Sequence, residues 1–240
     1  FGWRFKNCFF ENVYSDGACF YIDSNSACAR FKFESCNFTP NAHGPGISTG
    51  KGFHCVNQNA VSHGFENCSF SQGAYGIYIH GGSVRCTSCE FTLNSVSDLY
   101  FGIMNPSLLE HCWSEQSRQF ITSDYRDEYN MLTLVSCQCA SYPWAYWKYD
   151  ENNRTQPTND DKQWACISWD RPSLVLIGCT FNDPNLFANV GSISPVQSSQ
   201  PTVICPNTHN PVSDFAVLGS WSMNGAGPTY DSTFLSIAGA

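Results

Sequence analysis

The chain has 240 residues, of which 42% are hydrophobic and 13% charged, and its formal net charge is −8 at pH 7. A nucleic-acid groove needs clustered Lys and Arg, whereas the 12 basic residues here are scattered, so nucleic acid is not expected as a partner. No apolar run approaches the roughly 18 residues of a membrane-spanning helix, so membrane insertion is not expected either.

A six-residue pattern centred on a cysteine recurs along the sequence, most clearly as FENCSF from Phe65 to Phe70. The other copies are FKNCFF from Phe5, FESCNF from Phe33, CTSCEF from Cys86, LEHCWS from Leu109, LVSCQC from Leu134 and LIGCTF from Leu176. The key cysteines are Cys8, Cys36, Cys68, Cys89, Cys112, Cys137 and Cys179, with spacings of 28, 32, 21, 23, 25 and 42 residues. Repeats of this period are typical of solenoids.

Three positions of each copy favour the interior: the apolar residue three before the cysteine, the cysteine itself, and the residue two after it, which is usually Phe. A flat strand alternates inward and outward side chains, so two residues between inward positions require a bend. The residue just before the cysteine is Asn, Ser, His or Gly, types that tolerate left-handed or turn conformations. The pattern therefore predicts a sharp corner between two short strands.

A third strand is expected after each cysteine strand. These strands are Gly17 to Asp23, Lys51 to Asn57, Gly73 to His80, Ser97 to Met104, Arg118 to Tyr125 and Gln163 to Asp170. Three strands per repeat predict an all-β fold, a parallel β-helix whose rungs pair at a spacing of about 4.8 Å. We expect about seven rungs over residues 1–190, and an irregular last rung, a cap or a junction to further sequence over residues 191–240.

Two loops interrupt the repeat. Residues 40–50, rich in Gly and Pro, form the first, and residues 140–162 form the largest. Between them, side-chain alternation places Tyr78, His80 and Tyr100 on the outside of the third strands. Both loops leave the same corner, so the face of the third strands between them is the expected site of any function.

The F-x-N-C-x-F pattern resembles the rungs of the right-handed parallel β-helix of the pectate-lyase-like superfamily, which includes polysaccharide lyases, hydrolases and the tailspikes of bacteriophages. The resemblance covers about residues 1–190 and implies a right-handed solenoid. It is specific for architecture and selects no chemistry, because the same rungs carry lyases, hydrolases and non-enzymatic shafts.

The motifs that this resemblance associates with pectin enzymes are missing. Polygalacturonase-type hydrolases carry NTD, DD, GHG and RIK motifs, and this chain has only Asp160-Asp161, which lies in the large insertion. A calcium-dependent pectate lyase would need clustered carboxylates on strands with a nearby arginine, and Asp170-Arg171 is the nearest approach. Pectin enzymes are therefore disfavoured.

The chain contains 14 cysteines, and seven of them share one slot of the repeat. This favours an interior ladder of reduced thiols, which behave as small hydrophobic groups. One or two disulfides involving Cys86, Cys139 or Cys205 are the alternative. Zinc motifs at finger spacing are lacking, so no metal or cofactor is expected. A reduced ladder fits assembly in a reducing cytoplasm, as for virion parts.

Glycosidases use two carboxylates about 5 to 9.5 Å apart. The candidate catalytic residues are Glu115, Asp124 and Asp127, which fall within one rung; the alternative is a solvated turn held by Arg126. The candidate substrate-binding residues are Tyr142, Trp144, Tyr146, Trp147, Tyr100 and Asp170. Exposed aromatic side chains on a loop either stack on a ligand or cover another surface, so the alternative for the insertion is contact with the solenoid or a neighbouring chain.

The expected function is that of a virion tailspike or tail-fibre segment that recognises a host surface glycan, with depolymerisation of that polysaccharide left open. One alternative is a non-catalytic structural or adhesion β-helix of a virion or cell-surface fibre, and another is a secreted polysaccharide lyase or hydrolase. The resemblance to tailspikes implies a homotrimer in the virion or outside the cell. Because the sequence opens without Met in the middle of a rung, we expect it to be part of a longer polypeptide.

Overall fold

The regular structure in the described part of the chain consists of β-strands. The computed structural model describes residues 2–11, 17–25, 30–40, 50–102, 105–117, 119–123, 132–140, 149–150, 153–154, 167–168, 173–181 and 202–204. Within these ranges there is no helix that is long and apolar enough to cross a membrane.

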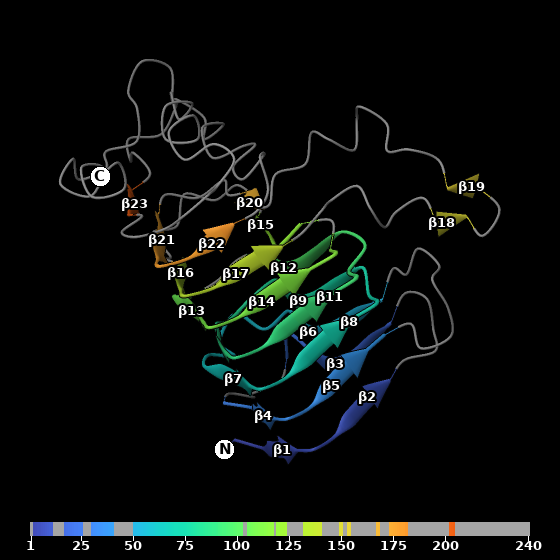
Figure 1. The fold of residues 1–240 in the computed structure, drawn as a ribbon. Coiled ribbons are helices and arrows are strands. Elements are labelled where there is room, and N and C mark those ends of the chain that lie inside the picture. The colour runs from blue at the N-terminus through green and yellow to red at the C-terminus, as the bar shows by residue number, and fades with distance from the viewer. Residues whose placement is uncertain are drawn as a thin grey trace, which may run out of the picture.

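Three parallel sheets run along the molecule, here called sheets A, B and C (Figure 1). Sheet A contains β1 (Arg4–Lys6), β4 (Lys32–Glu34), β7 (His63–Glu66), β10 (Val84–Thr87), β13 (Ser107–Glu110), β16 (Leu132–Val135), β21 (Ser173–Ile177) and β23 (Thr202–Ile204). Sheet B contains β2 (Phe9–Glu11), β5 (Asn37–Thr39), β8 (Ser69–Ser71), β11 (Glu90–Thr92), β14 (Trp113–Glu115), β17 (Gln138–Ala140) and β22 (Thr180–Phe181). Sheet C contains β3 (Ala18–Ile22), β6 (Lys51–Cys55), β9 (Tyr75–Ile79), β12 (Ser97–Phe101), β15 (Ile121–Ser123) and β20 (Ile167–Ser168).

Successive turns of the chain place each strand beside its counterpart in the next turn, and the strands of sheets A, B and C pair in parallel. The prediction of an all-β parallel solenoid is therefore confirmed. A separate antiparallel pair, β18 (Tyr149–Asp150) and β19 (Asn153–Arg154), lies within the large insertion.

The regular three-sided part of the solenoid has about four turns, fewer than the roughly seven rungs expected from the cysteines. The cysteine pattern counts only the corner between sheets A and B. A complete turn also needs a strand in sheet C, where β3, β6, β9 and β12 have five residues each but β15 has three and β20 has two. Sheet A continues past residue 190 through β23, which pairs with β21; most of residues 191–240, the expected cap, lies outside the described residues.

The corner between sheets A and B has the expected left-handed conformation. Its seven residues have φ angles between 50 and 59°, and they are Asn7, Ser35, Asn67, Ser88, His111, Ser136 and Gly178. The backbone N–H groups at this corner donate to carbonyl groups of the following turn, as from Ser88 to Glu110 at 2.9 Å. The bend thus keeps its hydrogen bonds, and the prediction of a sharp corner is confirmed.

Ser88 offers a direct test of this corner, because its side chain is exposed and its φ is 53°. A β-branched residue is strained at positive φ, so Ser88→Val is expected to lower the free energy of unfolding by about 1–2 kcal/mol. Ser88→Gly should cause no loss, since glycine adopts positive φ freely. The control is Glu90→Val, two residues later on a strand, where urea unfolding should change by less than about 0.5 kcal/mol. Equal losses for the two valine variants would contradict the assignment.

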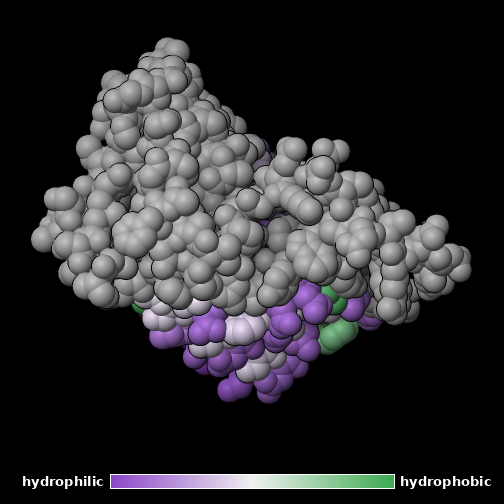
Figure 2. Space-filling model, turned by 45° about the horizontal axis from the view of Figure 1, so that its top comes forward, coloured by the Kyte–Doolittle hydropathy of each residue, from purple (hydrophilic) through white to green (hydrophobic). Residues whose placement is uncertain are grey.

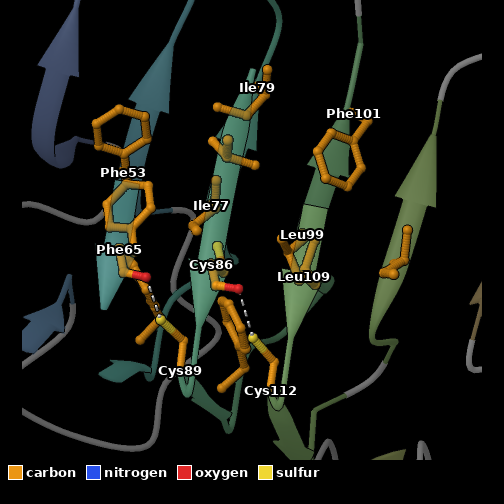
Figure 3. Packing of buried hydrophobic residues seen from close by; sticks show 14 of the residues in the cluster. Phe53, Phe65, Ile77, Ile79, Cys86, Cys89, Leu99, Phe101, Leu109 and Cys112 are labelled. Atoms are coloured by element: carbon orange, nitrogen blue, oxygen red, sulfur yellow. Dashed lines mark hydrogen bonds between the residues drawn. The ribbon is translucent and has the colours of Figure 1, made fainter. Parts of the chain in front are cut away.

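Stacked phenylalanine rings fill the N-terminal half of the interior. From sheet B, Phe10, Phe38, Phe70 and Phe91 stack with centroid separations of 4.8, 4.7 and 5.1 Å. Rings from sheet A meet this column edge to face, as at Phe65 and Phe70 with a centroid separation of 5.3 Å. Further along, Ile77, Leu99 and Leu109 continue the buried core (Figure 3).

The key cysteines line the interior of the corner. Six of them are buried, whereas Cys8, in the first turn, is half-buried. The thiols of the five key cysteines from Cys68 to Cys179 donate to carbonyl groups of the preceding turn, as from Cys89 to Phe65 at 3.4 Å and from Cys112 to Cys86 at 3.6 Å (Figure 3). All cysteines in the described ranges are free, including Cys86 and Cys139, so the disulfide alternative is wrong for these two. Cys205 lies outside the described residues.

Candidate functional site

The outer face of sheet C carries a column of ring-bearing side chains, here called the aromatic ladder: Tyr21, His54, Tyr78 and Tyr100. Backbone pairing places them on four successive strands, β3, β6, β9 and β12, in register. Tyr21 is 55% exposed, and the other three are half-buried. Parallel register therefore brings together side chains that are up to 79 residues apart in the sequence.

Neighbouring rings of the ladder are in contact. The centroid separations are 5.0 Å from Tyr21 to His54, 4.9 Å from His54 to Tyr78 and 4.1 Å from Tyr78 to Tyr100. Tyr78 and Tyr100 stack with an interplanar angle of 10°, whereas the His54 ring is turned by 84° relative to Tyr78. Because the two rings are stacked, each of these tyrosines has one ring face covered by the other.

Two further side chains adjoin the ladder. The Tyr75 ring lies 4.9 Å from that of Tyr78, and the Lys51 ammonium lies 5.3 Å from the centre of the Tyr78 ring. Burial, together with the charges of Lys51 and His80, lowers the pKa of His54 to about 4. His54 is therefore neutral at pH 7 and has one ring nitrogen that donates and one that accepts. The ladder thus offers neutral hydrogen-bonding groups beside one cation.

Of the predicted site residues, Tyr100 and Glu115 lie in the described part of the chain, and they are on different sheets. Tyr100 belongs to the ladder on sheet C, whereas Glu115 ends β14 of sheet B, half-buried, and accepts a hydrogen bond from Trp113 Nε1 at 3.2 Å. The other predicted catalytic and binding residues lie outside the described residues, namely Asp124, Asp127, Tyr142, Trp144, Tyr146, Trp147 and Asp170.

The face of sheet A differs from that of sheet C. On sheet A, opposite charges pair within a strand, as at Lys32 with Glu34, and between neighbouring strands, as at Lys32 with Glu66 and at Arg85 with Glu110. Where described residues are visible in Figure 2, they are mainly hydrophilic, with a small hydrophobic area. The concentration of rings on sheet C is therefore a local feature and does not extend over the whole described surface.

Sequence reasoning missed a carboxylate in the interior, Asp98 of β12, which is 0% exposed. Its Oδ1 accepts a hydrogen bond from Asn94 Nδ2 at 2.8 Å, and its Oδ2 accepts one from the Ser114 hydroxyl. Burial raises the pKa of Asp98 to about 7, although hydrogen bonds from Ser114, Ser117 and Asn94 oppose the rise. A group with no exposure cannot contact a polysaccharide, so we assign Asp98 a structural role.

Asp98 fits the interior because a larger residue at its own position is matched by a smaller residue at a neighbouring position. Its counterpart in the preceding turn is Gly76, where a Cβ atom would lie 3.0 Å from both Phe70 and Phe91. In the next turn the position paired with Phe91 is Ser114. The smaller serine leaves room for the Asp98 side chain and donates a hydrogen bond to it. The available signal was an Asp at the position that Gly52 and Gly76 occupy in the two preceding turns.

Within the described ranges, no three His, Cys, Asp or Glu side chains are grouped so that they could hold a metal ion. The side chains of the aromatic ladder can form hydrogen bonds and ring contacts with a ligand.

Comparisons with known proteins add no relative: the chain matches no protein-family model, no curated protein and no solved structure. Its classification therefore rests on architecture, and the chain is an all-β protein built as a parallel β-solenoid.

Proposed function

We propose that this chain is the glycan-recognising segment of a surface fibre, similar to the β-helices of the pectate-lyase-like superfamily found in phage tailspikes, and that it binds a surface polysaccharide along sheet C. The observation that carries the proposal is the aromatic ladder of Tyr21, His54, Tyr78 and Tyr100. Partly exposed aromatic side chains gathered on a rigid sheet favour a binding surface.

The geometry of a β-solenoid suits a polymer. Equivalent side chains repeat at about 4.8 Å along the axis, so one ladder offers successive hydroxyl and imidazole groups to successive parts of a linear chain. Sugar hydroxyls both donate and accept hydrogen bonds, as do tyrosine hydroxyls and neutral histidine. The backbone of the ladder is held by parallel pairing on both sides of β6 and β9, which limits the entropy lost on binding.

The rival function is a structural or adhesion fibre without glycan binding. Cleavage of the bound polysaccharide by Glu115 with Asp124 or Asp127 stays a prediction, as do the homotrimer, the virion or extracellular location and the third alternative, a secreted enzyme. Glu115 is separated from the ladder by the corner between sheets B and C, so a substrate bound along the ladder would have to reach across that corner to be cut by it.

The test is binding to an array of bacterial capsular and lipopolysaccharide glycans, followed by affinity measurement on any glycan that binds. Tyr78→Ala and Tyr100→Ala are each expected to weaken binding at least tenfold, which corresponds to about 1.4 kcal/mol. Trp3→Ala is the control, because Trp3 is an exposed aromatic residue outside the three sheets. Chain-length analysis of the same glycan after incubation with wild type and Glu115→Gln reports cleavage.

The fibre alternative gains support if no glycan on the array binds, or if the tyrosine variants bind as well as wild type while melting at the same temperature. Equal cleavage by wild type and Glu115→Gln would remove Glu115 from the catalytic hypothesis without affecting the binding proposal.

A further inference from the structure

The outer face of sheet B has a chemistry different from that of the other two sheets. Its outward positions from β2 to β14 form two columns in register. The first contains Phe9, Asn37, Ser69, Glu90 and Trp113, and the second contains Glu11, Thr39, Ser71, Thr92 and Glu115. None of these ten side chains is basic or aliphatic, whereas the face of sheet A carries Lys and Arg paired with Glu.

Trp113 is the large aromatic residue on the C-terminal part of this face, and it is 37% exposed. Its indole N–H donates to Glu115 Oε2 at 3.2 Å, two residues further along the same strand. The one polar group of the ring is therefore already bonded, and the exposed part of the ring is hydrocarbon. Such a surface is costly in water unless a ligand or another surface covers it.

Polar side chains flank the ring along the axis. Backbone register places Glu90 of β11 on one side of Trp113 and Gln138 of β17 on the other, each at about 4.8 Å in the strand-pairing direction. Both side chains are exposed. The apolar ring of Trp113 thus lies between a carboxylate, which accepts hydrogen bonds, and an amide, which donates and accepts them. A pyranose has an apolar C–H face and a rim of hydroxyl groups, so this combination of groups suits it.

The charges select the kind of sugar. Glu90 and Glu115 lie on this face, and no basic side chain occupies its outward positions from β2 to β14. A uronic acid, sulfate or phosphate group would be repelled by these carboxylates, and the outward positions from β2 to β14 offer it no cation to pair with. An uncharged sugar meets no such penalty, and its hydroxyl groups can donate to the carboxylates.

We propose that Trp113, with Glu90 and Gln138, forms a saccharide subsite on the outer face of sheet B that takes uncharged sugars. It is separate from the aromatic ladder on sheet C and does not depend on it. Glu115 acts here as a positioning residue, because its carboxylate holds the indole ring along the strand and exposes the hydrocarbon edge.

The test uses the whole chain and four hexasaccharide probes, measured by calorimetry and ligand-observed NMR. Three probes are neutral, namely maltohexaose, cellohexaose and chitohexaose, and the fourth is hexagalacturonate, which is anionic. At least one neutral probe is expected to bind, and Trp113→Ala should weaken that binding at least tenfold. Trp113→Ala should leave hexagalacturonate unaffected, whether or not that probe binds elsewhere.

Two comparisons distinguish this subsite from the ladder and from a folding defect. Tyr78→Ala should leave the Trp113-dependent binding within about twofold of wild type, so failure of the ladder proposal and failure of this one are separable. Glu115→Gln keeps a hydrogen-bond acceptor for the indole and should change affinity by less than about threefold, whereas Glu115→Ala releases the ring and should weaken binding more. The proposal is overturned if no neutral probe binds, or if Trp113→Ala binds neutral probes as wild type does.

Discussion

Replacing Phe70 by Ala is expected to lower the free energy of unfolding by about 3 to 5 kcal/mol, because it leaves a cavity in the interior. Phe70 is 0% exposed and lies in the middle of the column of rings from sheet B. It stacks on Phe38 at 4.7 Å and on Phe91 at 5.1 Å, and it meets Phe65 edge to face. Backbone hydrogen bonds between turns hold the surrounding strands, so the site can collapse only in part.

The control for this experiment is Phe9→Ala. Phe9 lies on β2 of the same sheet, but it points outward and is 60% exposed. Its removal deletes the same atoms without opening an interior cavity, and a change of less than about 1 kcal/mol is expected. Urea unfolding followed by circular dichroism measures both variants. A loss below about 1 kcal/mol for Phe70→Ala would mean that the inward assignment of the column is wrong.

Replacing Asp98 by Asn is expected to stabilise the protein at pH 7 to 8 and to leave it unchanged at pH 4. Asp98 is fully buried, and its pKa rises from an ordinary value of 3.8 to about 7. Between these pH values the unfolded chain releases the proton of this carboxyl group while the folded chain keeps it. The free energy of the unfolded state therefore falls relative to that of the folded state as pH rises. The stability that Asp98 contributes is present below about pH 4 and lost toward pH 7.

The magnitude follows from the same pKa. Each pKa unit is worth about 1.4 kcal/mol, so a rise from 3.8 to about 7 corresponds to an effect of about 4 kcal/mol at most. The amide introduced by Asp98→Asn keeps an oxygen that accepts from Asn94, and the hydroxyl groups of Ser114 and Ser117 can turn to accept from its NH₂ group. The substitution thus removes the charge and preserves the hydrogen bonds.

The measurement is the free energy of unfolding of wild type and Asp98→Asn in urea at pH 4, 5, 6, 7 and 8. Burial lowers the pKa values of His54 and His63 to about 4, so these two groups reduce stability as pH falls below about 6.5, the opposite direction. Their effect is common to both proteins and cancels in the difference. Asp23→Asn, at an exposed carboxylate just after β3, is the control and should give a curve parallel to wild type. Parallel curves for Asp98→Asn would contradict the prediction.

The candidate site was predictable only in part, and the reason is the variable distance from each cysteine to the third strand. Tyr21, His54, Tyr78 and Tyr100 follow their key cysteines by 13, 18, 10 and 11 residues. Alternation within single strands identified outward tyrosines, but loops of different length hid the fact that His54 shares their column. Only backbone pairing between β3, β6, β9 and β12 sets that register.

A similar limit applies to Asp98 and to Glu115. The backbone pairs Ser97 with Tyr75 and Leu99 with Ile77, and it buries Ser97, Asp98 and Leu99 together, which simple alternation does not predict. Glu115 and Tyr100 were both expected to belong to one site on the face of the third strands. The corner between β14 and β15 instead separates sheet B from sheet C, so they lie on different sides of the solenoid.

Local sequence is enough to specify the solenoid, its A–B corner and its interior columns. The residue before each key cysteine tolerates positive φ, and its backbone preference specifies the corner. The small thiol and the Phe that usually stands two residues after it fill the interior by their volume. Both features repeat with every turn. The packing of one turn on the next sets which outward side chains meet, how Asp98 and Ser114 share interior space, and how many turns are complete. These features depend on pairing between distant strands across loops of unequal length, and no local preference encodes that register.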